Sequence, residues 1–76
     1  MQKWEYMFVF TRDGKVLSAN KQKMGNAPLF GEVKGPDYRD YINQLGQEGW
    51  EMVSINNLST GGSPSFLELI LKRPIE

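Results

Sequence analysis

The fold is decided by one stretch of sequence, Leu45-Gly46-Gln47-Glu48-Gly49-Trp50-Glu51-Met52-Val53-Ser54-Ile55. A helix commonly ends at a residue with positive φ, which glycine adopts without steric cost. Gly49 is therefore predicted to end a helix, and Trp50 to begin a strand that returns along it. We expect the ring of Trp50 to be buried between this helix and a sheet.

The helix that ends at Gly49 is expected to begin at Gly35-Pro36-Asp37. Proline suits a first helical turn, and the Asp37 and Asp40 carboxylates favour the positive end of the helix dipole. Helical spacing joins the apolar positions into one stripe, made of Tyr38, Tyr41, Ile42, Leu45 and Gly49. Gly46 lies near this stripe and costs about 1 kcal/mol relative to alanine, so it is interpreted as a point of close approach to the sheet.

Two strands are predicted before the helix. Residues 3–11 alternate between two faces, one of which carries the aromatic row Trp4, Tyr6, Phe8 and Phe10. Asp13-Gly14 fits a two-residue hairpin turn, and the second strand is expected from Lys15 to about Lys23, with its lysines at an exposed edge. Residues 24–36 contain three glycines and two prolines and are expected to form a loop.

Two further strands are predicted after the helix, from Trp50 to about Asn57 and from Ser65 to Arg73. The last strand is apolar on both faces, which favours a central position, and Pro74 is expected to end it. A wholly antiparallel sheet would instead place the first strand beside the third, so the strand order stays open. The expected fold is α+β, in the order β-β-α-β-β, with a four-stranded, mostly antiparallel sheet and one helix packed on one face.

Length and composition restrict the function. A chain of 76 residues has room for one domain, residues 1–76, with one core. It contains no cysteine and no histidine, so it has no disulfide, no thiolate or imidazole metal ligand and no triad-type nucleophile and base. We therefore expect a non-enzymatic protein with no catalytic residues, no metal and no cofactor. Association with another subunit is the remaining aid to the stability of so small a domain.

The net charge is zero, which argues against a general binder of polyanions. Residues 1–36 carry six cationic and three acidic residues, a net +3, whereas residues 37–76 carry three and six, a net −3. No stretch approaches the ~18 apolar residues of a membrane span. A cytoplasmic protein that does not enter a membrane is expected.

Three matching segments carry a family resemblance: Lys3-Trp4-Glu5-Tyr6 at the start, Leu45-Gly46-Gln47-Glu48-Gly49-Trp50-Glu51-Met52-Val53-Ser54 in the middle and Leu71-Lys72-Arg73-Pro74 near the end. With these segments the chain resembles the small bacterial and phage proteins grouped as domain of unknown function 4177. The resemblance spans nearly the whole chain. It implies an α+β domain of a few strands with one helix, and it implies no activity and no catalytic residues.

Three groups of residues are candidates for chemistry. Glu48 and Glu51 resemble a carboxylate pair, but one lies in a last helical turn and the other on a strand, so surface or capping roles are expected. The loop from Ser59 to Ser65 has two glycines but lacks the lysine and the following helix of a phosphate-binding loop. A small anionic ligand could contact Tyr38, Arg39 and Arg73.

The aromatic row with Trp50 could form a stacking platform for single-stranded nucleic acid, with Arg12 and the lysines of the second predicted strand holding phosphates. A 76-residue domain needs its large aromatic side chains inside, however, so we expect the row in the core and no binding of nucleic acid.

One helix covers one face of a four-stranded sheet, and the second face is too apolar for water. Either the loop at residues 24–33 folds over it with Leu29 and Phe30, or another subunit does. We expect a symmetric homodimer, with an interface made by Met7, Val9, Phe66 and Ile70. The expected function is that of an oligomeric interaction or accessory domain. The alternatives are a protein that sequesters a nucleotide-like ligand at a subunit interface and a binder of single-stranded nucleic acid.

Overall fold

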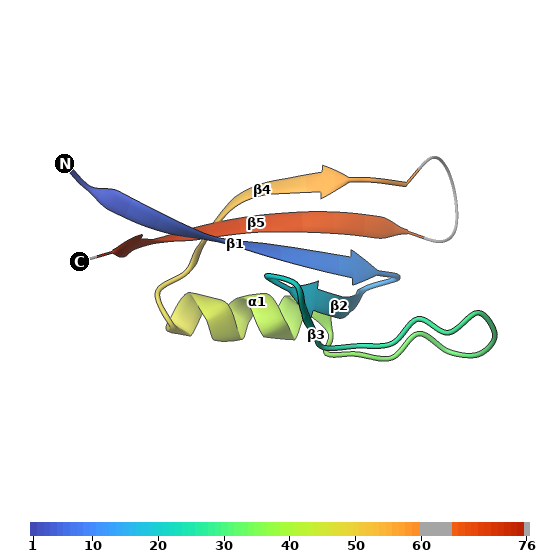
Figure 1. Cartoon of the computed structure of the whole chain (residues 1–76). Helices are drawn as coiled ribbons and strands as arrows, with labels where there is room; N and C mark the ends of the chain where they lie inside the picture. The colour runs from blue at the N-terminus through green and yellow to red at the C-terminus, as the bar shows by residue number, and fades with distance from the viewer. Residues whose placement is uncertain (60–64, 76) are drawn as a thin grey trace.

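The computed structural model describes residues 1–59 and 65–75, which form an α+β domain with one helix and one antiparallel sheet (Figure 1). In chain order the elements are β1 (Lys3–Arg12), β2 (Lys15–Ala19), β3 (Gln22–Lys23), α1 (Tyr38–Gln47), β4 (Glu51–Asn57) and β5 (Phe66–Ile75). Within the described residues the sheet has five strands, in the order β3-β2-β1-β5-β4. The fold class is confirmed, and the expected count of four strands is wrong by one.

The additional strand arises because the predicted strand from Lys15 to Lys23 is a hairpin. Asn20 and Lys21 have φ angles of 49° and 70°, and the chain turns there so that Gln22 pairs with Ala19. Asparagine tolerates the left-handed region better than most residues, and no glycine marks this turn. Asn20 also anchors the turn to β1: its Oδ1 accepts a hydrogen bond of 2.8 Å from the N–H of Phe8, and its own N–H donates to the Phe8 carbonyl oxygen.

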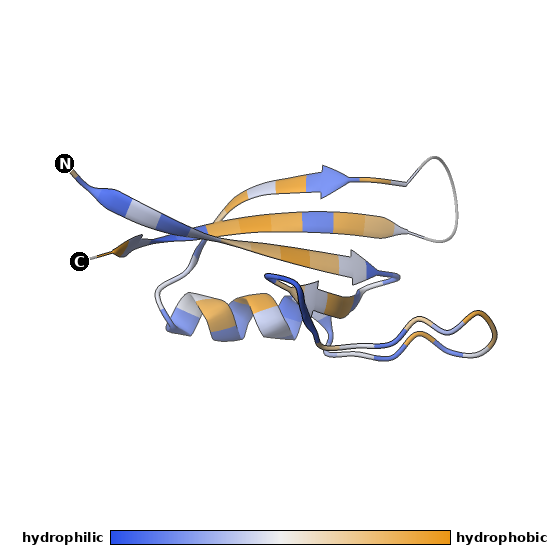
Figure 2. Cartoon of the chain, viewed as in Figure 1, coloured by the Kyte–Doolittle hydropathy of each residue, from blue (hydrophilic) through white to orange (hydrophobic). Residues whose placement is uncertain are grey.

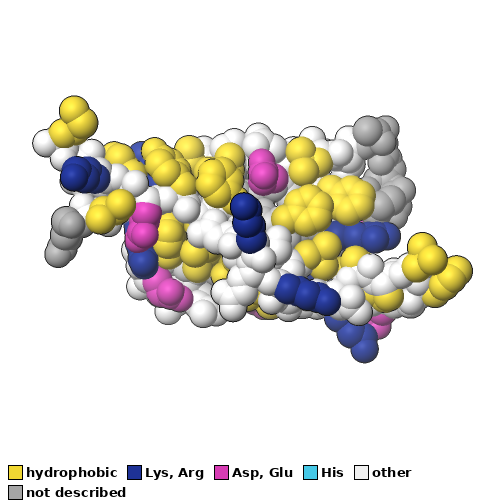
Figure 3. Space-filling view, in the orientation of Figure 1, with side chains coloured by type: hydrophobic (Ala, Val, Ile, Leu, Met, Phe, Trp, Pro, Cys, Tyr) yellow, Lys and Arg dark blue, Asp and Glu magenta, His cyan; other side chains and the backbone are white. Residues whose placement is uncertain are grey.

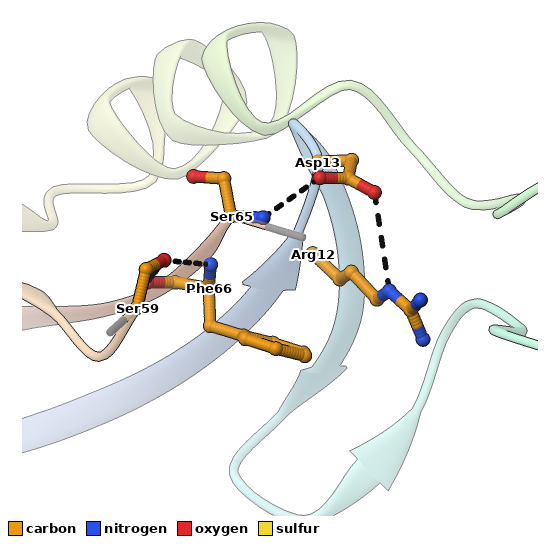
Figure 4. A network of polar contacts seen from close by, with 5 residues as sticks. All are labelled: Arg12, Asp13, Ser59, Ser65 and Phe66. Atoms are coloured by element: carbon orange, nitrogen blue, oxygen red, sulfur yellow. Dashed lines mark hydrogen bonds and ion pairs between the residues drawn. The ribbon is translucent and has the colours of Figure 1, made fainter. Parts of the chain in front are cut away.

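The turn between β1 and β2 is the predicted one, since Asp13 and Gly14 have φ angles of 49° and 82°. Asp13 also holds the start of β5. Its N–H donates to the Ser65 carbonyl oxygen at 2.8 Å, and its carboxylate accepts from the Ser65 N–H at 2.8 Å (Figure 4). Ser59 Oγ accepts from the N–H of Phe66 at 2.7 Å. These contacts fix the register at this end of the sheet.

Strand β5 is central, as its composition predicted. It pairs with β1 over ten residue pairs, from Lys3 opposite Ile75 to Arg12 opposite Phe66, and with β4 on its other side. The strand runs to Ile75 instead of ending at Arg73. Strand β4 pairs only as far as Lys72, so Pro74 lies where β5 has a single neighbour and a missing N–H is tolerated.

Helix α1 has the predicted stop and a well-defined start. Asp37 is the N-cap residue, and its carboxylate accepts hydrogen bonds from the backbone N–H groups of Arg39 and Asp40. At the other end Gly49 has a φ of 94°, and its N–H donates to the Gly46 carbonyl oxygen at 3.1 Å. The N–H of Trp50 donates to the Leu45 carbonyl oxygen at 3.0 Å, which completes a Schellman motif.

Gly46 does not mark a close approach to the sheet. It is exposed, and a Cβ built on it would meet no atom within 4 Å outside the local helix backbone. The interpretation of Gly46 as a packing position is therefore wrong, because the side of the helix that carries it faces away from the sheet. In the part of the chain that the structure describes, no helix has the length and apolar character needed to cross a membrane.

The core lies between α1 and one face of the sheet. Its buried apolar side chains come from β1, β2, β5, the helix and the segment between α1 and β4: Val9, Val16, Ala19, Leu45, Trp50, Leu69 and Leu71. The ring of Trp50 is buried as expected, with 8% of its surface exposed. Tyr38, Tyr41 and Ile42 pack against this cluster, which confirms the apolar stripe of the helix apart from Gly49, an exposed residue beyond the end of α1.

Residues 24–36 form an arm that projects from the sheet (Figure 1). Asn26 and Lys34 pair across it through two backbone hydrogen bonds of 2.7 and 2.8 Å. Leu29 and Phe30 are 91% and 87% exposed, and Figure 2 shows hydrophobic residues at the tip. The arm therefore does not fold over the sheet, and the loop-covered arrangement is not the one adopted by this chain.

Candidate functional site

The most distinctive surface is the face of the sheet opposite α1. Directly paired residues of antiparallel strands share a face, so every second pair of β1 and β5 points away from the helix. We call this set the open face: Trp4, Tyr6, Phe8, Phe10 and Arg12 from β1, with Phe66, Glu68, Ile70, Lys72 and Pro74 from β5. Figure 3 shows hydrophobic side chains gathered along the sheet.

The aromatic row is outside the core. Trp4, Tyr6 and Phe8 are 39%, 49% and 50% exposed, so the expectation that the row is buried is wrong. The alternate residues of β1 point toward α1, where Val9 pairs with Leu69 in the fully buried centre. The core between helix and sheet is filled by these aliphatic side chains and by Trp50. The rings of the aromatic row on β1 therefore lie on the other side of the sheet.

Cations pack on the rings of the open face. The Lys72 ammonium lies 4.2 Å from the centre of the Trp4 ring, and the Arg12 guanidinium lies 5.5 Å from the centre of the Phe66 ring. Phe66 in turn stacks on Phe10, with 5.8 Å between ring centroids and 16° between ring planes. The face is therefore an ordered arrangement of rings and charges.

Two opposite charges flank Ile70 on the open face. Glu68 lies opposite Phe10 and accepts a hydrogen bond of 3.4 Å from Asn56, while Lys72 lies opposite Tyr6. The sequence prediction treated residues 65–73 as apolar on both faces and missed this pair. The sequence contained this information, because Glu68 and Lys72 are four positions apart on one strand and therefore share a face.

Two of the four residues proposed for a subunit interface, Phe66 and Ile70, belong to the open face. Met7 and Val9 do not: they point toward α1, Val9 is fully buried and Met7 packs against the core. Strand pairing places them beside Leu71 and Leu69 on the side that α1 covers, so they do not line the open face.

The three residues proposed for an anionic ligand do not come together. Tyr38 and Arg39 lie at the start of α1, where Arg39 Nε donates to the Tyr38 hydroxyl at 3.2 Å, and this hydrogen bond raises the pKa of Arg39. Arg73 lies beyond the other end of the helix, which at ten residues is about 15 Å long. No pocket is found in the described part of the chain.

Arg73 instead fastens the C-terminal end of α1 to the sheet. Its guanidinium forms an ion pair with Glu5 on β1, donates to the Glu48 carbonyl oxygen at 3.2 Å and lies 4.4 Å from the centre of the Trp50 ring. Through these contacts the Arg73 side chain stabilises the packing of α1 on the sheet at the edge of the core.

The remaining chemical candidates are surface groups. Glu48 is the C-cap residue, Glu51 pairs with Lys72 across the strands, and both are exposed. Partial burial and the Glu48 carboxylate raise the pKa of Tyr41. Among the described residues no three acidic side chains gather in a way that could hold a metal ion. The loop from Ser59 to Ser65 was considered as a phosphate-binding loop, and its residues 60–64 lie outside the described residues.

One comparison with known proteins gives a result. The family model described as Domain of unknown function (DUF4177) matches residues 4–74, which include the whole open face. No curated protein and no solved structure matches the chain.

Proposed function

The chain belongs to the DUF4177 family, and from that premise we propose that it is a non-enzymatic interaction domain that works as a homo-oligomer through its open face. The observation that supports the proposal is the row of rings on β1, which stands half-exposed along a strand of ten residues. Contiguous apolar surface of this kind usually marks a contact with another macromolecule.

The total exposed surface supports the same proposal. The chain exposes 5463 Å² at a mass of 8.7 kDa, whereas a folded monomer of this mass exposes roughly 4,700 Å² on average. An open face without a covering layer and an arm that stands away from the sheet both add exposed surface. Burial of the open face against another subunit would remove apolar surface from water, at about 25 cal/mol per Å².

The chain offers a matched pair of substitutions for testing the open face. Phe8 is half-exposed at its centre, and Phe30 is exposed at the tip of the arm. Phe8→Glu is expected to raise the dissociation constant of the oligomer at least about 100-fold, because it places a carboxylate in an apolar contact. Phe30→Glu should leave association unchanged. Sedimentation equilibrium over a concentration series measures both, and circular dichroism checks that each variant is folded.

Three results would contradict the proposal. Wild-type protein that sediments at 8.7 kDa throughout the series would exclude an oligomer. Loss of association in Phe30→Glu would place the contact at the arm. Loss of association in Ile55→Glu, but not in Phe8→Glu, would place it at the exposed edge of the sheet along β4.

Single-stranded nucleic acid is the second candidate for the open face. Half-exposed rings on a sheet, with Arg12 and Lys72 beside them, are what a base-stacking platform requires. The candidate ranks second because Glu68 on the open face and Glu51 on β4, which lies beside Lys72, repel phosphates. Saturable binding of a fluorescent oligothymidine, lost in Phe8→Glu, would favour it over self-association.

A further inference from the structure

We infer that the occupant of the open face is a second copy of this chain, docked face to face so that the strands of the two sheets run in opposite directions. The inference rests on the proposed function, and it adds the symmetry and register of the contact. The arrangement of charges on the open face carries it.

The paired residues of β1 and β5 form five rows across the open face. In order along the strands, the rows are Arg12 with Phe66, Phe10 with Glu68, Phe8 with Ile70, Tyr6 with Lys72 and Trp4 with Pro74. The middle row holds two apolar side chains. The acidic residue lies one row to one side of it, and a basic residue lies one row to the other side.

A two-fold axis that crosses the strands at the middle row reverses the order of the rows in the second copy. Phe8 and Ile70 then face their own equivalents, and Glu68 faces the partner's Lys72. The symmetry repeats each contact, so two ion pairs form on either side of an apolar centre. Sheets that pack face to face are about 10 Å apart, a gap that glutamate and lysine side chains reach across together.

The outer rows are also complementary in this arrangement. Trp4 faces the partner's Arg12, and an arginine over a tryptophan face is a favourable contact. Tyr6 faces the partner's Phe10, which joins two rings.

A two-fold axis that lies between the two sheets could also run along the strands, but charge repulsion disfavours that arrangement. An axis that runs along the strands keeps each row opposite the same row of the second copy. It places Glu68 near the partner's Glu68, Lys72 near the partner's Lys72 and Arg12 near the partner's Arg12. Like charges that face each other in a contact select against that arrangement.

Charge reversal tests the register. In the Glu68→Lys variant, position 68 carries a positive charge that faces the partner's Lys72. In the Lys72→Glu variant, position 72 carries a negative charge that faces the partner's Glu68. Each single variant is expected to raise the dimer dissociation constant roughly tenfold or more. A mixture of the two variants should form a heterodimer with near wild-type affinity, because both contacts are again between opposite charges. Glu32→Lys on the arm makes the same charge change away from the open face and is the matched control.

Sedimentation equilibrium and native mass spectrometry of the single variants and their mixture decide between the outcomes. Equal dimerisation of Glu68→Lys, Glu32→Lys and wild type would overturn the register while leaving the proposed function intact, provided that Phe8→Glu still dissociates. A monomeric wild type would overturn both. Lys72→Glu brings a second carboxylate beside Glu51, so if it does not fold, the comparison of Glu68→Lys with Glu32→Lys decides alone.

Discussion

Trp50→Ala is expected to lower the free energy of unfolding by roughly 3–5 kcal/mol, as is typical when a large buried ring is removed from a core. The ring is 8% exposed, lies in the core cluster with Leu45 and Leu69, and has the Arg73 guanidinium 4.4 Å from its centre. A domain of this size has little stability to lose, so the variant should be largely unfolded at room temperature. Urea denaturation followed by circular dichroism measures the change.

The chain contains a matched control in its other tryptophan. Trp4 is 39% exposed and contacts Lys72 on the open face, so Trp4→Ala is expected to cost no more than about 1 kcal/mol. In a Trp4→Phe background the fluorescence of Trp50 should be blue-shifted and poorly quenched by iodide. A stable Trp50→Ala variant that has lost only its association would show that Trp50 is a contact residue.

Gly49→Val is expected to destabilise the domain by roughly 1–3 kcal/mol, because a β-branched side chain is strongly disfavoured at positive φ. Gly49 has a φ of 94° and closes the Schellman motif that turns the chain from α1 into β4. A Cβ at this position would meet no atom within 4 Å, so the strain comes from the backbone conformation and not from a collision. Thermal melting at a fixed concentration measures the loss.

Gly46→Ala is the control for Gly49 and should change stability in the opposite direction. Gly46 is an exposed residue inside the helix, and alanine there is expected to add up to about 1 kcal/mol. Equal melting temperatures for Gly49→Val and wild type would contradict the left-handed conformation at residue 49.

The sequence predicted the features that are encoded by neighbouring residues. Asp13-Gly14 marks a turn with positive φ at both positions, and Gly49 marks the end of a helix, because glycine in these settings has a single low-strain explanation. The burial of Trp50 follows from its place directly after that stop. The turn at Asn20-Lys21 carried no comparable mark, since lysine rarely adopts a φ of 70°. The hairpin of β2 and β3 was therefore read as one strand.

The sequence of β1 alone does not determine which face of the sheet α1 covers. One set of alternate residues carries four aromatic rings, whereas the other carries only Met7 and Val9 as apolar side chains, so the set with the rings is the natural candidate for a core. The choice follows from long-range pairing, which places Val9 beside Leu69 under the helix and Phe8 beside Ile70 on the other side. The position of Arg73 away from Tyr38 and Arg39 could not be predicted for the same kind of reason, because the partners of Arg73 come from residues 5, 48 and 50.

The pairing of β1 with β5 also sets the order in which the domain can fold during synthesis. The two strands at the centre of the sheet are separated by more than fifty residues, so β1 leaves the ribosome long before the strand that completes it. Until residues 66–75 are released, only the local hairpins of β1, β2 and β3 and the nascent helix can form. Closing so long a loop is entropically costly, and we therefore expect slow folding for a chain of this length. During this interval both faces of β1, including its four aromatic rings, are exposed to chaperones and to other nascent chains.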